Sequence, residues 1–231
     1  MMLKKCGTSI GCHSLGVSLP DLSELQGVHA GETVWVLGSG SSLGFVDSSF
    51  FFGKTVVSTN YSAHSIGLRP DYVFTHYHKL AYEFLEDSRL LTVVTLQKDT
   101  VTHNEWPHKE VSNLVMAPQD SYAAPGSSWD PFTRNPPRAD SLAYGSSSLH
   151  GAMHLAAHLG AAHIILVGAD CGTIDGQHRT EGYPAGHTPW ALYNKHHKLM
   201  KDWLQVKYGV TVYSLNPFIN FNLEGHRFDG L

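Results

Sequence analysis

Residues 33–42 read TVWVLGSGSS, in which an apolar run from Thr33 to Leu37 breaks into a loop of glycine and serine. A short β-branched and aromatic run that ends in such a loop is typical of a buried strand followed by a tight turn. Similar runs recur at 54–59, 71–75, 90–96, 162–167 and 210–214, and helical patterns cover 149–159 and 190–208. This alternation predicts an α/β, Rossmann-like fold, with a mostly parallel sheet and helices on both faces.

The domain organisation follows from length and local composition. The chain has 231 residues, enough for one large domain with its own core. We expect residues 1–30 to be an N-terminal segment and residues 31–231 to be a single nucleotide-binding domain. Residues 117–146 are rich in Pro, Ser, Gly and Asp, which predicts a long, lid-like loop within that domain.

Composition limits the class of protein. Hydrophobic residues make up 42% of the chain and charged residues 16%, and the net charge is −4, as in a globular protein without a basic surface for nucleic acid. The cysteine count is three, an odd number that favours reduced thiols in a cytoplasmic protein. No apolar run is long enough to span a membrane, and the first residues do not resemble a signal peptide.

Polar residues follow several of the expected strands. In an open parallel sheet, ligands bind outside the carboxyl ends of the strands. We therefore expect a nucleotide site at that edge, built from Gly38, Ser39, Gly40, Ser42, Asn60, His76 and Asp170. The glycine loop also suits a plain strand-to-helix turn, and each polar residue alone could cap a turn. A dinucleotide site is disfavoured, because Leu43 stands in place of the third glycine and Asn60 in place of an acidic residue.

Two further segments carry candidate site residues. Ser147 and Ser148 begin the helix expected over 149–159, where hydroxyls and free N–H groups bind phosphate or simply cap the helix. The loop 171–187 holds His178, Arg179 and His187. A histidine ahead of a helix could act as a general base, and His178 or Arg179 could neutralise a leaving phosphate, although loop histidines usually lie in water.

Three histidines recur at every fourth position along the same expected helix, at 150, 154 and 158. This spacing places them on one face. Two such histidines could bind a metal, but no nearby Asp, Glu or Cys completes a ligand set. We expect a polar face or a subunit contact, with the chain as a possible homo-oligomer.

Four segments in order resemble one family. VLGSGSSLGFVD, VVSTNYS, SSSLHGAMHLAAHLGAAHIILVGADCG and AGHTPWALYNKHHKLMKDWLQVKYGVTVYSLNP are similar to blocks of the bacterial lipooligosaccharide sialyltransferases (family 42 glycosyltransferases) and of the related DUF115 group. The resemblance covers residues 33–75 and 145–217. It implies that Asn60 contacts a nucleotide and that His187, in the Gly-His pair, is the catalytic base. Departures from the pattern include Ser39 for Asn and Ser41 for Pro.

The resemblance implies transfer of sialic acid or a related sugar from a CMP-activated donor to a glycan hydroxyl. We expect general-base-assisted inverting displacement without a required cofactor, because hydrogen bonds can stabilise a departing CMP. One alternative is a DUF115-type pyrophosphokinase, with Mg²⁺ held by Asp170 and Asp175. Another is a non-catalytic module that keeps the nucleotide fold for binding a protein.

Overall fold

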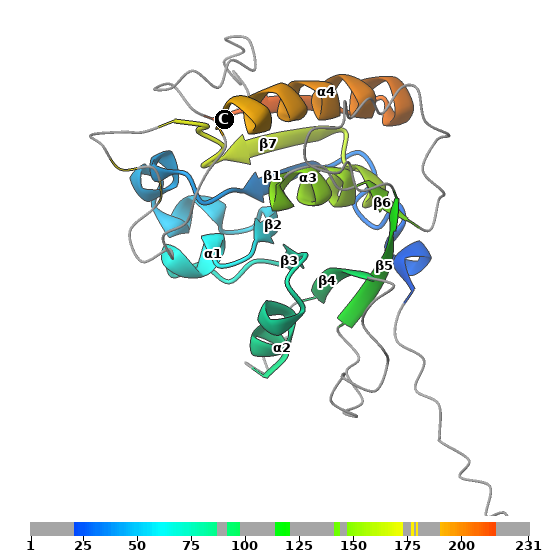
Figure 1. The fold of residues 1–231 in the computed structure, drawn as a ribbon, viewed down its shortest axis with the longest axis horizontal. Coiled ribbons are helices and arrows are strands. Elements are labelled where there is room, and N and C mark those ends of the chain that lie inside the picture. Colours follow the sequence, from blue (N-terminus) through cyan, green and yellow to red (C-terminus); the bar gives the residue numbers. More distant parts are fainter. Residues whose placement is uncertain are drawn as a thin grey trace, which may run out of the picture.

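The computed structural model describes residues 21–86, 92–97, 114–120, 141–143, 147–172, 177, 179 and 190–215. They form a parallel sheet with helices on both faces (Figure 1), so the predicted fold class is confirmed. The strands are β1 (Thr33–Leu37), β2 (Thr55–Thr59), β3 (Tyr72–Thr75), β4 (Thr92–Gln97), β5 (Leu114–Asp120), β6 (Leu142–Ala143), β7 (His163–Val167) and β8 (Thr211–Ser214). The helices are α1 (Ser62–Ser65), α2 (His78–Glu86), α3 (Ser148–His158) and α4 (Trp190–Tyr208), with 3-10 helices η1 (Leu22–Leu25), η2 (Ser41–Phe45) and η3 (Ser48–Phe51).

The sheet has eight strands in the order β6-β5-β4-β3-β2-β1-β7-β8. Every neighbouring pair is parallel. The chain moves outward from β1 to β6 and then returns to place β7 on the other side of β1. The loops after β1 and β7 therefore leave the sheet at the point where the strand order reverses, which is where open α/β sheets bind ligands.

The central strands are apolar on both sides, because each side of the sheet is covered. On one side Val34, Val36 and Phe74 pack in a core with α3 and α4. On the other side Trp35 and Leu37 pack with residues of η2, η3 and α1. Burying each large apolar side chain contributes about 1.5–3 kcal/mol. This two-sided burial explains why the strands read as continuous apolar runs rather than as alternating patterns.

Two strands were not expected from the sequence. Residues 117–120 and 142–143, inside the segment expected to be a loop, belong to β5 and β6. Pro118 and the polar residues after it gave no strand signal, since proline lacks the N–H group that a sheet ladder uses. Residues 121–140 and 144–146, the rest of the expected lid, lie outside the described residues.

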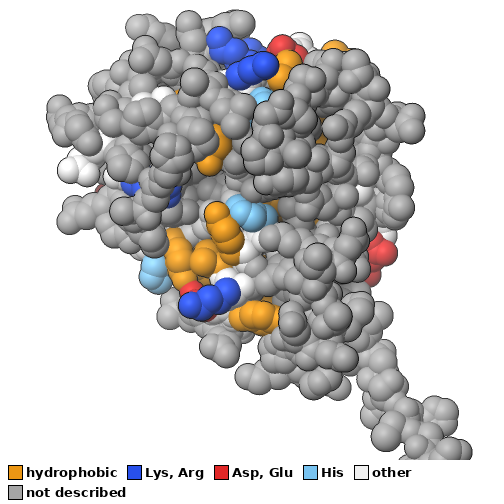
Figure 2. Space-filling view, viewed as in Figure 1, with side chains coloured by type: hydrophobic (Ala, Val, Ile, Leu, Met, Phe, Trp, Pro, Cys, Tyr) orange, Lys and Arg blue, Asp and Glu red, His pale blue; other side chains and the backbone are white. Residues whose placement is uncertain are grey.

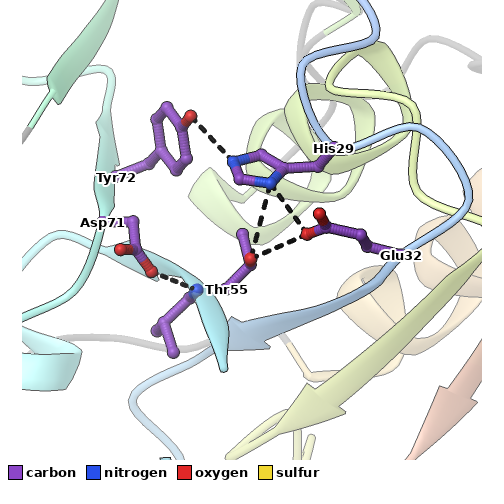
Figure 3. A network of polar contacts seen from close by, with 6 residues as sticks. His29, Glu32, Thr55, Asp71 and Tyr72 are labelled. Carbon is purple, nitrogen blue, oxygen red and sulfur yellow. Dashed lines mark hydrogen bonds and ion pairs between the residues drawn. The ribbon is translucent and has the colours of Figure 1, made fainter. Parts of the chain in front are cut away.

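A polar network fastens the amino ends of three strands (Figure 3). His29 Nδ1 lies 2.8 Å from Glu32 Oε2, and Thr55 Oγ1 donates to the same carboxylate at 3.1 Å. His29 Nε2 lies 3.0 Å from the Tyr72 hydroxyl. The Asp71 carboxylate accepts the N–H of residue 56 at 2.8 Å. Burial, with the nearby charges of Asp71 and Glu32, raises the pKa of Tyr72, so its hydroxyl stays protonated beside the imidazole. The segment before β1 is thus tied to β2 and β3.

The histidine stripe of α3 is interior, which corrects the expectation of a polar face or subunit contact. Every residue of α3 is buried. His154 Nδ1 accepts the N–H of Ala143 at 2.6 Å, and His154 Nε2 lies 2.6 Å from the Tyr208 hydroxyl. His158 Nε2 lies 2.8 Å from the carbonyl oxygen of Leu22. Burial, together with His158, lowers the pKa of His154 to about 3. These imidazoles are neutral and join α3 to the segments around it.

The last helix, α4, has a buried side and an exposed side. Met200, Trp203 and Leu204 are buried against the core, whereas Lys195 and Lys198 are exposed. Lysine and arginine side chains are visible at the top of Figure 2, where Figure 1 draws α4. In the described ranges, no helix combines the length and the apolar content that crossing a membrane requires.

Candidate functional site

The loops after β1 and β7 pack backbone against backbone. Gly40 donates its N–H to the carbonyl of Gly168 at 2.8 Å, and Gly38 donates to the carbonyl of Val167 at 2.7 Å. A Cβ atom at Gly38 would stand 2.5 Å from the Gly168 oxygen, and one at Gly40 would stand 2.6 Å from the Asp170 carboxyl carbon. The glycine pattern therefore serves the close approach of the two loops. These contacts join the β1 loop to the β7 loop at the point where the strand order of the sheet reverses.

The Asp170 carboxylate fastens the start of η2. It accepts the N–H of Ser42 at 2.7 Å and also the Ser42 hydroxyl. Asp170 is only 2% exposed. Burial raises the pKa of its carboxyl group, while the two bonds from Ser42 oppose the rise. Two of the predicted site residues, Ser42 and Asp170, therefore bond to each other across the β1 and β7 loops. Through this bond Asp170 positions the glycine loop.

Ser148 joins the ends of β2 and β3 to the first turn of α3. Its hydroxyl oxygen accepts the Asn60 amide N–H at 3.3 Å and lies 2.9 Å from His76 Nδ1. The Ser148 hydroxyl is thus the group that the Asn60 amide and the His76 imidazole share. Asn60 has a positive φ of 47°, a conformation that non-glycine residues rarely adopt and that often occurs at functional sites. We call Asn60, His76 and Ser148 the bridged triad.

A second polar chain connects α3, α4 and the loop after β7. His197 Nε2 lies 3.4 Å from the Ser147 hydroxyl, and His197 Nδ1 lies 3.4 Å from Cys171 Sγ. His150 Nδ1 accepts the N–H of Ser147 at 3.2 Å. Cys171 also has a positive φ, of 49°, so both non-glycine residues with this conformation in the described ranges follow strands at the carboxyl edge.

Neither member of the Cys171–His197 pair is ionised near neutral pH. Burial, with the charge of Asp170, raises the pKa of the Cys171 thiol to about 12. Burial, with His196, lowers the pKa of His197 to about 3. A thiolate is the nucleophilic form of cysteine, so this pair does not form an activated nucleophile. It acts as a neutral hydrogen-bonded support for the end of β7 and the first turn of α3.

The loop after β7 returns to the glycine loop of β1. The Ser41 hydroxyl donates to the carbonyl of Gln177 at 2.8 Å. Arg179 stands two residues further along and is half-buried. This contact brings the neighbourhood of Arg179 to the start of η2. The neighbouring candidates His178 and Asp175, and the expected base His187, lie outside the described residues.

The structure thus divides the expected nucleotide residues into two groups at one edge of the sheet. One group comprises Gly38, Ser39, Gly40, Ser42 and Asp170 at the ends of β1 and β7, and the other comprises the bridged triad. Ser147 lies beside the triad and bonds toward α4. Within the described ranges, no group of three His, Cys, Asp or Glu side chains is arranged to hold a metal ion.

Sequence reasoning missed Cys171 and His197. Two signals were available, since Cys171 directly follows Asp170 and a His-His pair lies on the helix expected over 190–208. Neither signal indicates which side of that helix faces the site. The contact depends on how α4 packs over α3, which local sequence does not determine.

Comparisons with known proteins bear on the fold. A scan against protein-family models finds no match, and a search of curated proteins finds no significant match. The fold is similar to a solved structure described as that of the MAf glycosyltransferase from Magnetospirillum magneticum AMB-1, with a TM-score of 0.50 and 13% sequence identity. The match covers 88% of this chain and 38% of that chain. This chain therefore spans well under half of that protein's length.

Proposed function

We propose that this chain is a glycosyltransferase that uses a nucleotide-activated sugar, with CMP-sialic acid or a related CMP-sugar as the donor. The observation that carries the proposal is the presence of the bridged triad and the glycine loop at the same carboxyl edge of the sheet, with the triad at the first turn of α3. Hydroxyl, amide and imidazole groups at such an edge suit a ribose and a phosphate. The similarity in fold to a glycosyltransferase supports the choice of enzyme class.

The proposal gives each group of residues a role. Asn60, His76 and Ser148 hold the nucleotide, and the loop with Gly38, Ser39 and Gly40 lies along it. Ser147 supports the first turn of α3, while Ser42 and Asp170 keep the glycine loop in place. His178 or Arg179 stabilises the departing phosphate.

The proposed reaction is a single inverting displacement. The oxygen of the acceptor hydroxyl forms a bond with the anomeric carbon of the donor sugar, on the side opposite the leaving group. The bond between that carbon and the phosphate oxygen breaks, and CMP leaves with the electron pair. His187 takes the proton of the acceptor hydroxyl, as a general base with a pKa near neutrality can do. No metal is needed when cationic or hydrogen-bonding side chains stabilise the phosphate.

The first experiment asks whether the chain binds a nucleotide. The melting temperature is measured with CMP, UDP and ATP, each with and without EDTA. A ligand at 100 times its dissociation constant stabilises a protein by about 2.7 kcal/mol, which raises the melting temperature of a domain of this size by about 5–10 °C. We expect this shift for CMP in the presence of EDTA. A shift for ATP that needs Mg²⁺ would favour the pyrophosphokinase, and no shift for any nucleotide would favour a binding module.

The second experiment tests the assigned base. Release of CMP from a CMP-sugar in the presence of glycan acceptors is measured for the wild type and for His187→Ala. We expect the variant to lose at least about 100-fold in rate and to keep the thermal shift with CMP. His163→Ala, at the start of β7 on the opposite edge of the sheet, is the matched control and should retain full activity. Full activity in His187→Ala would remove the assigned role.

A further inference from the structure

Tyr77 places a fixed aromatic ring next to the bridged triad. It directly follows His76, and the two ring centroids are 3.7 Å apart with an interplanar angle of 40°. Its N–H donates to the Thr75 hydroxyl at 3.1 Å, and its carbonyl accepts the N–H of Ala81 at 3.1 Å. The backbone is thus held on both sides, at the end of β3 and at the start of α2. The residue is nevertheless 51% exposed.

The corresponding tyrosine after β2 is used differently. Tyr61 follows Asn60, but its hydroxyl donates to the Glu83 carboxylate and its ring packs on Phe84, with centroids 5.3 Å apart. Tyr61 therefore joins β2 to α2 and helps to hold the fold. Among the described residues, the Tyr77 hydroxyl makes no hydrogen bond, and Tyr77 has no comparable structural task. Its exposed surface remains available to a ligand.

We infer that Tyr77 is a stacking surface for the nucleobase of the bound nucleotide, an inference that rests on the proposed function. An aromatic ring fixed by its neighbours loses little conformational freedom when a planar ligand covers it. The bridged triad beside it offers polar groups to the ribose and phosphate. The base would then lie on the Tyr77 ring while the rest of the nucleotide reaches toward α3.

Stacking has a recognisable selectivity. Every base has a flat face, so an aromatic surface raises the affinity for any nucleotide without choosing among bases. It adds nothing to a ligand that lacks a base. Ribose 5-phosphate carries the same sugar and phosphate as a nucleotide and is therefore the informative probe.

The test is isothermal titration of the full chain with CMP and with ribose 5-phosphate. We expect Tyr77→Ala to weaken CMP binding about tenfold or more and to leave binding of ribose 5-phosphate unchanged. Tyr77→Phe should bind CMP like the wild type, because stacking does not need the hydroxyl. Phe52→Ala removes another aromatic ring, 75% exposed, and is the control that should change neither affinity. Melting temperatures confirm that each variant is folded.

The outcomes separate this inference from the proposed function. Equal CMP affinity in Tyr77→Ala and the wild type would overturn the stacking surface and leave nucleotide binding intact. An equal loss for CMP and ribose 5-phosphate would also overturn it, since Tyr77 would then support the triad rather than the base. A wild type that binds neither probe would overturn the inference together with the proposed nucleotide site.

Discussion

Replacing His154 by leucine should flatten the response of stability to acid. The imidazole is buried between α3 and α4, where it accepts the Ala143 N–H and contacts the Tyr208 hydroxyl. Leucine fills a similar volume but removes the acceptor for that N–H. A buried unpaired N–H costs about 1–3 kcal/mol, so the variant should be less stable than the wild type at pH 7.5.

The magnitude of the pH effect follows from proton linkage. Burial lowers the pKa of His154 from 6.5 to about 3, so between these values the unfolded chain binds a proton that the folded protein does not. Stability conferred by the neutral imidazole is complete above pH 6.5 and is lost as the pH falls toward 3. At pH 5.5, one unit below the unfolded value, the loss is about 1.4 kcal/mol for this histidine. His197, whose pKa is also about 3, should add a similar amount.

Urea unfolding at pH 7.5 and pH 5.5 measures the difference directly. The wild type should lose about 1.4 kcal/mol more than His154→Leu between the two values. The control is His64→Leu, whose side chain is exposed on α1, and it should lose as much as the wild type because the buried histidines remain. If His154→Leu and the wild type lose the same free energy of unfolding between the two pH values, the imidazole of His154 does not resist protonation. The assignment of His154 as a buried neutral imidazole between α3 and α4 would then be wrong.

Three further predictions concern packing and the site. Gly151→Ala should destabilise the fold by about 1–3 kcal/mol in urea unfolding, because its Cβ would stand 2.8 Å from Phe74 Cε2 and closer to Cζ; the loss should shrink in combination with Phe74→Leu, and strict additivity would contradict the clash. Ser148→Ala should weaken CMP binding about fivefold in titration, since Asn60 and His76 lose their shared partner. Unchanged affinity would exclude a role of the bridged triad in binding the nucleotide. Arg179→Gln should weaken binding of CMP about tenfold and leave binding of cytidine, which lacks the phosphate, unchanged; equal losses for both would remove the phosphate contact.

Local sequence predicted the sheet well because its signals are local. The apolar runs around Val34, Val57 and Ile164 are long enough and β-branched enough to identify strands before any partner is known. The parallel arrangement alone then predicts that the polar residues that follow these strands lie at one edge of the sheet. The structure brings Asn60 and His76 to a common hydroxyl, which no spacing in the sequence indicates.

The features that sequence missed depend on packing between distant segments. The pattern of histidines along α3 was visible, but surface and interior stripes have the same period. Only the position of α4 over α3 decides that His154 meets Tyr208, and only the closeness of two loops decides that Asp170 meets Ser42. The burial of these polar groups depends on the tertiary structure, because a polar group is stable in the interior only where it finds a hydrogen-bond partner.

The electrostatics of the carboxyl edge limit how an anionic ligand could be held there. Burial lowers the pKa values of His150 and His197, so neither supplies positive charge at neutral pH, and the carboxyl group of Asp170 is engaged by Ser42. In the described part of this edge, the groups left to attract a phosphate are hydrogen-bond donors at the first turn of α3, His76 of the bridged triad, and Arg179, which the Ser41–Gln177 contact brings near. Neutral donors orient a phosphate, whereas a cation provides most of the attraction. The loop after β7, rather than the glycine loop, should therefore govern phosphate affinity.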